Sequence, residues 1–272
     1  MPKPILSPTI FLDTNAIHNA ISYLILADQY KLNPFGPVKE ISKIKAELGK
    51  ILPGEFYNHL IDGLYTLDYL QNQVEEKNAR VYTSRLTIAE MWSGRLDGQA
   101  HIRMSLQGIP YRLRQRQNVI NKLVMARLTQ ADYEKVNNEL GGLSQNWYER
   151  FGFELTFVED TTNARDILLL ALEIQKLTFI DVIDCILMAG SLAILSSEFI
   201  TSDAMLFEVM ERIKHPKSLA DKDQRALWEA AQMSILEQLR ILHLDKSIGI
   251  GHLVEPRKPS KLKIDVSKLH LI

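Results

Sequence analysis

Four acidic residues stand inside or directly beside strongly apolar segments, where an ionised carboxylate is costly unless something compensates for its lost hydration. They are Asp13, Glu90, Asp184 and Asp203. Basic partners, hydrogen bonds or a metal ion would compensate. Mg²⁺ and Mn²⁺ are hard cations that take oxygen ligands. If the four acids meet, they form a site for such an ion, and a site of this kind can hydrolyse a phosphodiester bond.

Taken singly, each of these acids has an ordinary structural explanation. An Asp after a strand usually caps the next helix, and an Asp within a helix usually makes a salt bridge. Zinc is disfavoured, because the chain has one cysteine and seven histidines without the spacing of zinc ligands. The four acids therefore carry an argument only as a set.

The elements that must position these acids alternate between strand and helix patterns. Short apolar strands are predicted over residues 9–12, 80–83, 153–158 and 199–201. Helices are predicted over residues 14–28, 39–52, 55–77, 85–92, 130–140, 162–176, from 178 or 181 to 195, 204–214 and 222–242. The tail after Gly249 contains Pro256, Pro259 and a run of cations at Arg257, Lys258, Lys261 and Lys263, which favours a loosely packed arm. This alternation predicts an α/β fold with a parallel sheet and helical insertions.

The four acids occupy matching places on these elements. Asp13 and Asp203 directly follow two of the predicted strands. Ser84 can cap the helix that carries Glu90, and Asp184 lies near the start of its helix. In open parallel sheets, functional sites gather at the carboxyl ends of the strands. We therefore expect the site at that edge of the sheet.

A second charged feature covers residues 98–131, which contain no Asp or Glu. Its candidate phosphate-binding cations are Arg112, Arg114, Arg116, Lys122 and Arg127. An acidic site repels a polyanion and needs cations nearby, so this stretch could grip a nucleic-acid backbone. The alternative is a basic helix face that pairs with acids elsewhere.

Bulk composition narrows the class of protein. The chain has 272 residues, 46% hydrophobic and 24% charged, which is typical of a folded globular protein. The net charge of −1 means that a polyanion must be held by a local basic surface. The single cysteine, Cys185, excludes an intramolecular disulfide and is expected to be buried. Without an apolar run of about 20 residues or a signal peptide, the chain is expected in the cytoplasm, away from membranes.

The motifs around the four acids resemble those of the PIN-domain nucleases, the family that includes the VapC-type toxin ribonucleases. In that family an apolar strand ends in Asp followed by Thr, Ser or Asn, as at residues 10–15 here, and a Ser or Thr precedes a helix that bears Glu, as at residues 83–90. The third acid heads an Asp-Ala-x-Ile-x-Ala helix, and the fourth follows a strand as Thr-x-Asp, as at residues 184–189 and 201–203. Cys185 stands where the family usually has Ala.

The resemblance implies a three-layer α/β/α PIN-like fold with a short central parallel sheet and large helical insertions. A nuclease domain would span residues 1–215, with its core at about 8–30, 80–95 and 153–210 and insertions at about 33–78 and 98–150. Residues 216–272 would add a C-terminal helix and a basic tail. Both spacers between the first three acids are longer than in a minimal toxin of the family.

The implied activity is a Mg²⁺- or Mn²⁺-dependent endoribonuclease in which Asp13, Glu90, Asp184 and Asp203 form the catalytic, metal-binding set. Supporting roles fall to Thr14, Asn15, Thr201 and Asp181. Asp181 lies one turn before Asp184, so either could be the third acid; the 19 positions from 184 to 203 favour Asp184. Family members often have an antitoxin or another protein partner and often dimerise. The resemblance therefore allows either a protein partner or a homodimer for this chain.

Two alternatives stay open. One is a catalytically inactive PIN-fold scaffold whose extra helices bind other proteins. The other is a structure-specific DNA nuclease of the flap-cutting type, since the residues themselves do not distinguish RNA from DNA.

Overall fold

The chain forms an α/β fold with a small, entirely parallel sheet of five strands in the order β3-β2-β1-β4-β5. The computed structural model describes residues 7–29, 46, 54–116, 119–140 and 152–262. The strands are β1 (Thr9–Leu12), β2 (Arg80–Thr83), β3 (Leu155–Phe157), β4 (Glu198–Ile200) and β5 (Glu255–Arg257). Parallel neighbours need crossover connections, and helices supply them.

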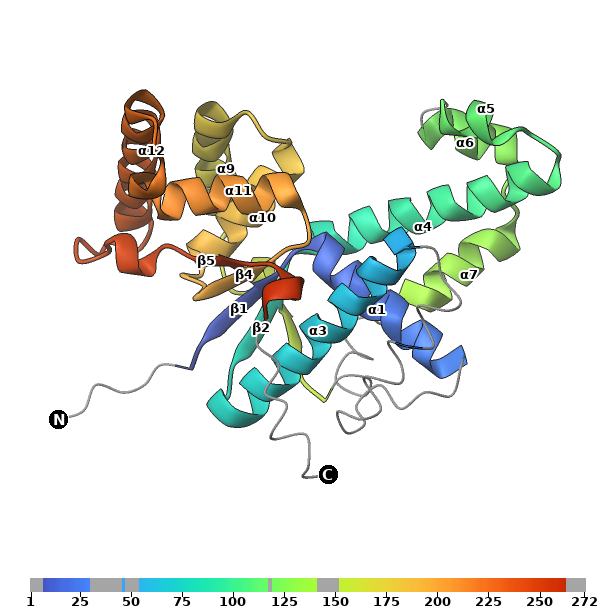
Figure 1. Ribbon diagram of the computed structural model, residues 1–272, viewed down its shortest axis with the longest axis horizontal. Coiled ribbons are helices and arrows are strands. Elements are labelled where there is room, and N and C mark those ends of the chain that lie inside the picture. The colour runs from blue at the N-terminus through green and yellow to red at the C-terminus, as the bar shows by residue number, and fades with distance from the viewer. Residues whose placement is uncertain (1–6, 30–45, 47–53, 117–118, 141–151, 263–272) are drawn as a thin grey trace.

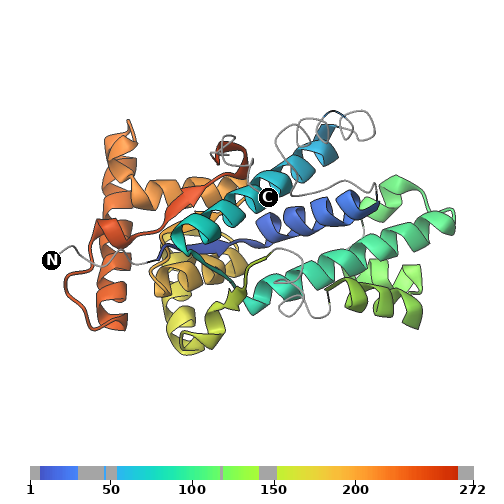
Figure 2. The same cartoon turned by 90° about the horizontal axis from the view of Figure 1, so that it is seen from below.

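Helices cover both faces of the sheet (Figures 1 and 2). On one face lie α1 (Thr14–Gln29) and α3 (Gly54–Lys77); on the other lie α9 (Ala164–Thr178), α10 (Val182–Ala193), α11 (Ala204–Lys214) and α12 (Lys222–Leu242). Successive strand residues point to opposite faces. Ile10 and Leu12 therefore join the core beneath α1 and α3, while Phe11 joins the core beneath the later helices. The Phe11 ring stacks on Phe199 with centroids 5.4 Å apart.

A close contact between α1 and α3 depends on a glycine. A Cβ atom at Gly63 would lie 2.2 Å from the backbone oxygen of Asn19. Such a distance is far inside van der Waals contact, so only glycine allows the two helix backbones to approach this closely. The packing of α3 against α1 fixes α1, which begins directly after Asp13.

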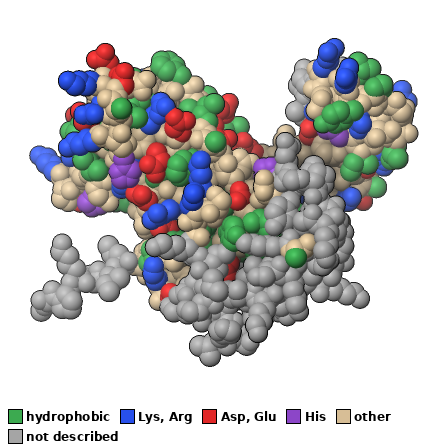
Figure 3. Space-filling view, in the orientation of Figure 1, with side chains coloured by type: hydrophobic (Ala, Val, Ile, Leu, Met, Phe, Trp, Pro, Cys, Tyr) green, Lys and Arg blue, Asp and Glu red, His purple; other side chains and the backbone are tan. Residues whose placement is uncertain are grey.

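A helical arm extends away from the sheet. It consists of α4 (Arg85–Leu106), α5 (Tyr111–Gln115), α6 (Val119–Ala126) and α7 (Gln130–Leu140), with α5 and α6 at the outer end of α4 (Figure 1). In Figure 3 this end is a separate lobe with Lys and Arg side chains at its top. The prediction that the first of these helices ends near residue 92 is wrong. The helix continues because Leu96, Ala100 and Met104 are buried against the arm.

Most predicted elements are confirmed, with small shifts at their ends. β1, β2, α7, α11 and α12 have the predicted bounds. The strand predicted over residues 153–158 is shorter, and the one over 199–201 is shifted by one residue. The helix predicted over residues 39–52 lies outside the described residues except for residue 46. Cys185 is buried, as predicted. Short 3₁₀ turns occur at Val158–Asp160, Pro216–Ser218, Ile250–His252 and Pro259–Lys261.

The prediction of a loosely packed tail after Gly249 is wrong up to residue 262. Residues Glu255–Arg257 form β5 and pair with β4, so Glu198 faces Glu255 in the ladder. Pro256 is tolerated because β5 is an edge strand of the sheet. Leu253, Val254 and Leu262 are buried and fix the segment. Across the described residues, no helix combines the length and the apolar character that crossing a bilayer requires.

Candidate functional site

The parallel register brings Asp13 and Thr201 to the same level at the carboxyl edge of the sheet. Leu12 pairs with Ile200, so the next residue of each chain segment leaves the sheet side by side. The Thr201 hydroxyl donates to Asp13 Oδ2 at 2.6 Å, and the Asp13 backbone N–H donates to Ile200 O at 3.1 Å. Asp13 is only 2% exposed. Its carboxyl is therefore buried and held in one orientation.

A row of threonine hydroxyls connects β2 and α4 to the start of α1. Thr83 donates to Leu12 O at 3.0 Å and contacts the Thr87 hydroxyl at 3.1 Å. Thr14 lies 3.4 Å from Thr87 and donates a short hydrogen bond to Glu90 Oε2. Glu90 is half-buried on the second turn of α4. This network fixes the Glu90 carboxylate relative to Asp13.

The start of α4 is fixed by a third strand of the sheet. Ser84 caps the helix by accepting from the Leu86 backbone N–H at 3.1 Å, as predicted. Glu159, which follows β3, accepts from the Arg85 backbone N–H at 3.1 Å and from the Ser84 hydroxyl. Arg85 pairs with Asp160 at 2.6 Å. Glu159 is thus an acid at the same edge of the sheet whose role is to hold α4.

The electrostatic setting of Asp13 is unfavourable to its ionised form. Burial raises the pKa of its carboxyl from 3.8 to about 7, against the lowering effect of the Thr201 hydrogen bond. The negative charges of Asp184 and Glu90 raise it further. Asp13 is therefore a carboxyl group that an adjacent cation would return to its ionised form.

Asp184 shares this environment. Burial raises the pKa of Asp184 to about 6, and the charges of Asp203, Asp181 and Glu90 add to the effect. Asp181 itself is exposed and caps α10, where its Oδ1 accepts from the Ile183 backbone N–H at 2.8 Å. The acids whose charges raise the pKa of Asp13 are Asp184 and Glu90. The structure thus brings Asp184 closer to the other acids.

Asp203 both caps a helix and lies near another acid of the site. Its Oδ1 caps α11 by accepting from the Met205 and Leu206 backbone N–H groups at 2.8 and 2.9 Å. Its charge also reaches Asp184. Capping therefore fixes one carboxylate oxygen while the group as a whole still faces the acids.

The four acids are neighbours without being in mutual contact. Among the described residues, only Glu211, His215 and Glu255 bring three ligand atoms within 4.8 Å of one another. That group lies where α11 ends beside β5, and His215 is exposed. Mg²⁺ typically keeps several waters and binds directly to one or two carboxylates. The spacing of the four acids suits a hydrated ion more than a closed protein cage.

Two further polar groups reach this edge from α3, which sequence reasoning did not connect to the acids. Ser202, between Thr201 and Asp203, donates to Asp62 Oδ2 at 3.3 Å and accepts from Asn19 Nδ2 at 3.2 Å. Burial raises the pKa of Asp62, and the charge of His59, one turn earlier on α3, partly offsets that rise. Only the packing of α3 on α1 places these residues here.

Of the predicted supporting residues, Thr14 and Thr201 contact the acids directly. Asn15 is exposed and makes no side-chain hydrogen bond to the acids in the described part of the chain. On α4, Arg95 Nη2 donates to Ser22 Oγ at 3.3 Å. Burial, followed by the charge of Arg95, lowers the pKa of His18. His18 thus lies near Arg95, where α1 packs against α4.

The predicted phosphate-binding cations do not act as one surface beside the acids. Lys122 is only 12% exposed and pairs with Asp97 at 3.1 Å, while Arg114 donates to His101 O at 2.9 Å. Arg112, Arg116 and Arg127 are exposed. Glu90 is 16 positions before the end of α4, which at 1.5 Å per residue places the arm tip about 24 Å away along the helix. The exposed cations of this set therefore lie toward the outer end of the arm and away from the acids.

Comparison of the chain with family models, with curated proteins and with solved structures finds no match in any of the three.

Proposed function

We propose that this protein is a Mg²⁺- or Mn²⁺-dependent endoribonuclease with a PIN-like fold. One observation carries the proposal. Asp13, at the end of the central strand, is a nearly fully buried carboxyl placed in the electrostatic field of two further carboxylates. Structural acids in such surroundings normally have a basic partner. Among the described residues, the polar neighbours of the Asp13 carboxyl are the Thr201 hydroxyl, the Thr14 backbone N–H and other acids.

The donor set supports a hard divalent cation. Asp13, Glu90, Asp184 and Asp203 offer carboxylate oxygens only, and no cysteine or histidine lies among them. A divalent cation held there would supply Lewis acidity, activate a water for attack on phosphorus and stabilise charge on the phosphate oxygens. These four side chains are the ones we expect to hold it, with Mg²⁺ and Mn²⁺ as the candidate ions.

The residues around the acids hold the carboxylates in fixed orientations before a substrate binds. Thr201 fixes Asp13, Thr14 fixes Glu90, and the first turn of α11 fixes Asp203. Outer hydrogen bonds of this kind orient ligands and typically account for about 10–100-fold in activity or metal affinity. The arm would contribute binding rather than chemistry, because its exposed cations lie about 24 Å from Glu90 along α4.

RNA as the substrate rests on the resemblance to PIN-domain ribonucleases. The same resemblance favours a cytoplasmic, toxin-like ribonuclease that can have an antitoxin or a second copy as partner. A matched cleavage comparison between RNA and flapped DNA tests this part separately, and preferential cutting of flapped DNA would favour the DNA nuclease.

The direct test removes the charge of two site aspartates while keeping the shape of each side chain. Asp203→Asn also keeps the oxygen that caps α11, and Asp13→Asn neutralises the buried acid. We expect both variants to lose Mn²⁺-dependent RNA cleavage by at least ~100-fold, beyond the effect of an outer hydrogen bond. Asp221→Asn is the control, since Asp221 caps α12 through two hydrogen bonds like those of Asp203 and lies outside the site. Full activity in either site variant, or in EDTA, contradicts the proposal.

One observation favours a catalytically inactive scaffold instead. No three of the four acids bring ligand atoms within 4.8 Å of one another in the described chain. A scaffold need not bind Mn²⁺, whereas a nuclease must. Calorimetric titration of the wild-type chain with Mn²⁺ therefore separates the two functions, and absence of binding favours the scaffold.

A further inference from the structure

A polar pocket lies between α3, β4 and the turn after β5, and none of the four acids lines it. Its volume is about 430 Å³, within the range of small-molecule sites. Glu198, which lines it, is the first residue of β4, and Lys77 ends α3 just before β2 begins. The acids instead follow the last residues of β1 and β4. The pocket is therefore separate from the proposed nuclease site, and its function does not depend on that site.

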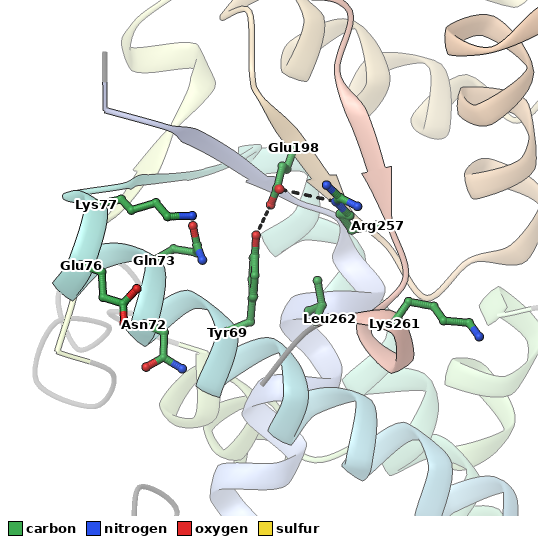
Figure 4. Close-up of a pocket in the computed structure, with 9 residues that line it drawn as sticks. All are labelled: Tyr69, Asn72, Gln73, Glu76, Lys77, Glu198, Arg257, Lys261 and Leu262. Atoms are coloured by element: carbon green, nitrogen blue, oxygen red, sulfur yellow. Dashed lines mark hydrogen bonds and ion pairs between the residues drawn. The ribbon is translucent and has the colours of Figure 1, made fainter. Parts of the chain in front are cut away.

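Glu198 lies at the floor of the pocket, where its carboxylate has neighbouring partners. The Tyr69 hydroxyl donates to Glu198 Oε2 at 2.6 Å, and Arg257 Nε lies 3.4 Å from Glu198 Oε1 (Figure 4). Burial and the bond to Glu198 raise the pKa of Tyr69, so its hydroxyl stays a donor. Glu198 is thus satisfied and its charge is compensated. It does not repel an anion in the pocket as a free carboxylate would.

Three further donors around the pocket have no side-chain partner among the described residues, whereas Asn72 donates to Asp68. In the part of the chain that the structure describes, the side chains of Gln73, Lys77 and Lys261 make no hydrogen bond or ion pair. Lys77 and Gln73 come from α3, with the Lys77 side chain reaching toward Gln73 (Figure 4). Lys261 comes from the turn after β5. Glu76, also at the rim, is exposed and has an interaction partner of its own.

The cations thus stand on two walls. Lys77 lies on the α3 wall and Arg257 on the wall formed by β5, while Lys261, at the rim, extends away from the other lining residues (Figure 4). Ammonium and guanidinium groups on both sides of a concave site favour a ligand with negative charge at more than one position. The volume exceeds that of a lone phosphate ion, and the Tyr69 ring and Leu262 add apolar surface for an organic group.

We propose that this pocket binds a small organic phosphate of nucleotide size, with anionic groups contacting Lys77 on one wall and Arg257 on the other, and with Lys261 at the rim. The probe that matches this arrangement is adenosine 3′,5′-bisphosphate. AMP carries one phosphate and adenosine carries none. Comparing the affinities of the three ligands therefore shows whether anionic groups contact one wall of the pocket or both.

The test is calorimetric titration of the full-length protein with the bisphosphate, AMP, adenosine and inorganic phosphate. The bisphosphate should bind at least ~10-fold more tightly than AMP, the effect of one charged hydrogen-bonded contact. Adenosine and inorganic phosphate should bind more weakly than AMP. Lys77→Gln and Lys261→Gln should each weaken the bisphosphate by ~10-fold. Lys246→Gln, an exposed lysine outside the pocket, is the control and should change nothing.

Several results would overturn the assignment. These are no binding of the bisphosphate at millimolar concentration, equal binding of bisphosphate and AMP, adenosine binding as tightly as either, or equal binding by wild type and Lys77→Gln. Asp13→Asn must leave the titration unchanged, because Asp13 is not among the residues that line the pocket. Failure of the nuclease proposal would therefore be seen in cleavage and failure of this one in binding alone.

Discussion

The two ends of α4 carry opposite charges in opposite settings. Near its start, Glu90 is half-buried and tied by Thr14 to a group of acids that the sheet brings together. At its outer end, Arg112, Arg116 and Arg127 are exposed on a small lobe. Buried, hydrogen-bonded charges are fixed in place and suit chemistry, whereas exposed cations act through a screened field and suit capture.

The burial of Asp13 should have its largest effect on how the free energy of unfolding changes with pH. Because the pKa of Asp13 is raised from 3.8 to about 7, folding favours its protonated form. This contribution to stability is complete below about pH 4 and is lost as the pH rises through 7. In EDTA, Asp13→Asn should therefore be more stable than wild type at pH 8 by on the order of 4 kcal/mol, at about 1.36 kcal/mol per unit of pKa.

Urea unfolding of both proteins at pH 4 and pH 8 measures this difference. At pH 4 the two should have nearly equal free energies of unfolding, since both side chains are then neutral in the folded state. Asp221→Asn should show no such change with pH. A difference between Asp13→Asn and wild type that is the same at both pH values would contradict the burial account.

The third acid of the site can be decided by a neighbouring pair of substitutions. Asp184→Asn should lower RNA cleavage by at least ~100-fold, because this half-buried acid lies in the field of Asp203 and Glu90. Asp181→Asn keeps the cap of α10 and should stay within about 3-fold of wild type, the range left by a modest change in distant charge. Initial rates with saturating Mn²⁺ give the ratio, and the reverse order would reassign the site to Asp181.

Two glycines contrast the packed sheet region with the arm. At Gly63, an added Cβ would meet the backbone of Asn19, so Gly63→Ala should destabilise the protein by about 2 kcal/mol as α1 and α3 separate. At Gly98 in α4, no atom lies within 4 Å of the added Cβ. There the helix propensity of alanine should stabilise by up to about 1 kcal/mol. Thermal unfolding measures the stability of both variants. Equal effects of Gly63→Ala and Gly98→Ala would contradict the expected difference in packing between the sheet region and the arm.

The smallest effect concerns RNA capture by the arm. Replacing both Arg112 and Arg116 with Gln should weaken RNA binding by about 10-fold and reduce the salt dependence by about 1.4, at roughly 0.7 per single-strand phosphate contact. The cleavage rate at saturating RNA should not change. Lys122→Gln should have less effect on the salt dependence, because Lys122 is already paired with Asp97.

Fluorescence anisotropy over a series of salt concentrations gives both slopes. If the double arginine variant keeps the wild-type slope, the arm does not contact phosphates. If Lys122→Gln lowers the slope as much as the double variant does, the pairing with Asp97 does not persist in solution.

Part of the acidic site could be predicted from local sequence because Asp13 and Asp203 each follow a recognisable strand. An apolar strand followed by Asp13, and another followed by Asp203, must deliver those residues to one edge once the strands are parallel. Ser84 indicated the start of α4 by its capping preference. These are short-range signals.

The rest depends on contacts between distant residues. Asp62 reaches Ser202 across 140 positions, and Lys122 finds Asp97 across 25. Neither pairing has a signature in the local pattern. β5 was missed for a related reason, since Pro256 and the nearby cations resemble a loop until the ladder with β4 is formed. A local sequence pattern can predict that a charged side chain is exposed, but it cannot predict which distant residue that side chain contacts.

The most direct test of the central claim is calorimetric titration of Mn²⁺ into wild type and Asp13→Asn at about pH 6.5 and pH 8, in buffers with different ionisation enthalpies. Because the pKa values of Asp13 and Asp184 are about 7 and about 6, binding at the lower pH should release protons and binding at the higher pH should release fewer. Asp13→Asn should bind weakly or not at all. Wild type that fails to bind Mn²⁺, or Asp13→Asn that binds it with the same affinity and the same proton release, would contradict the account.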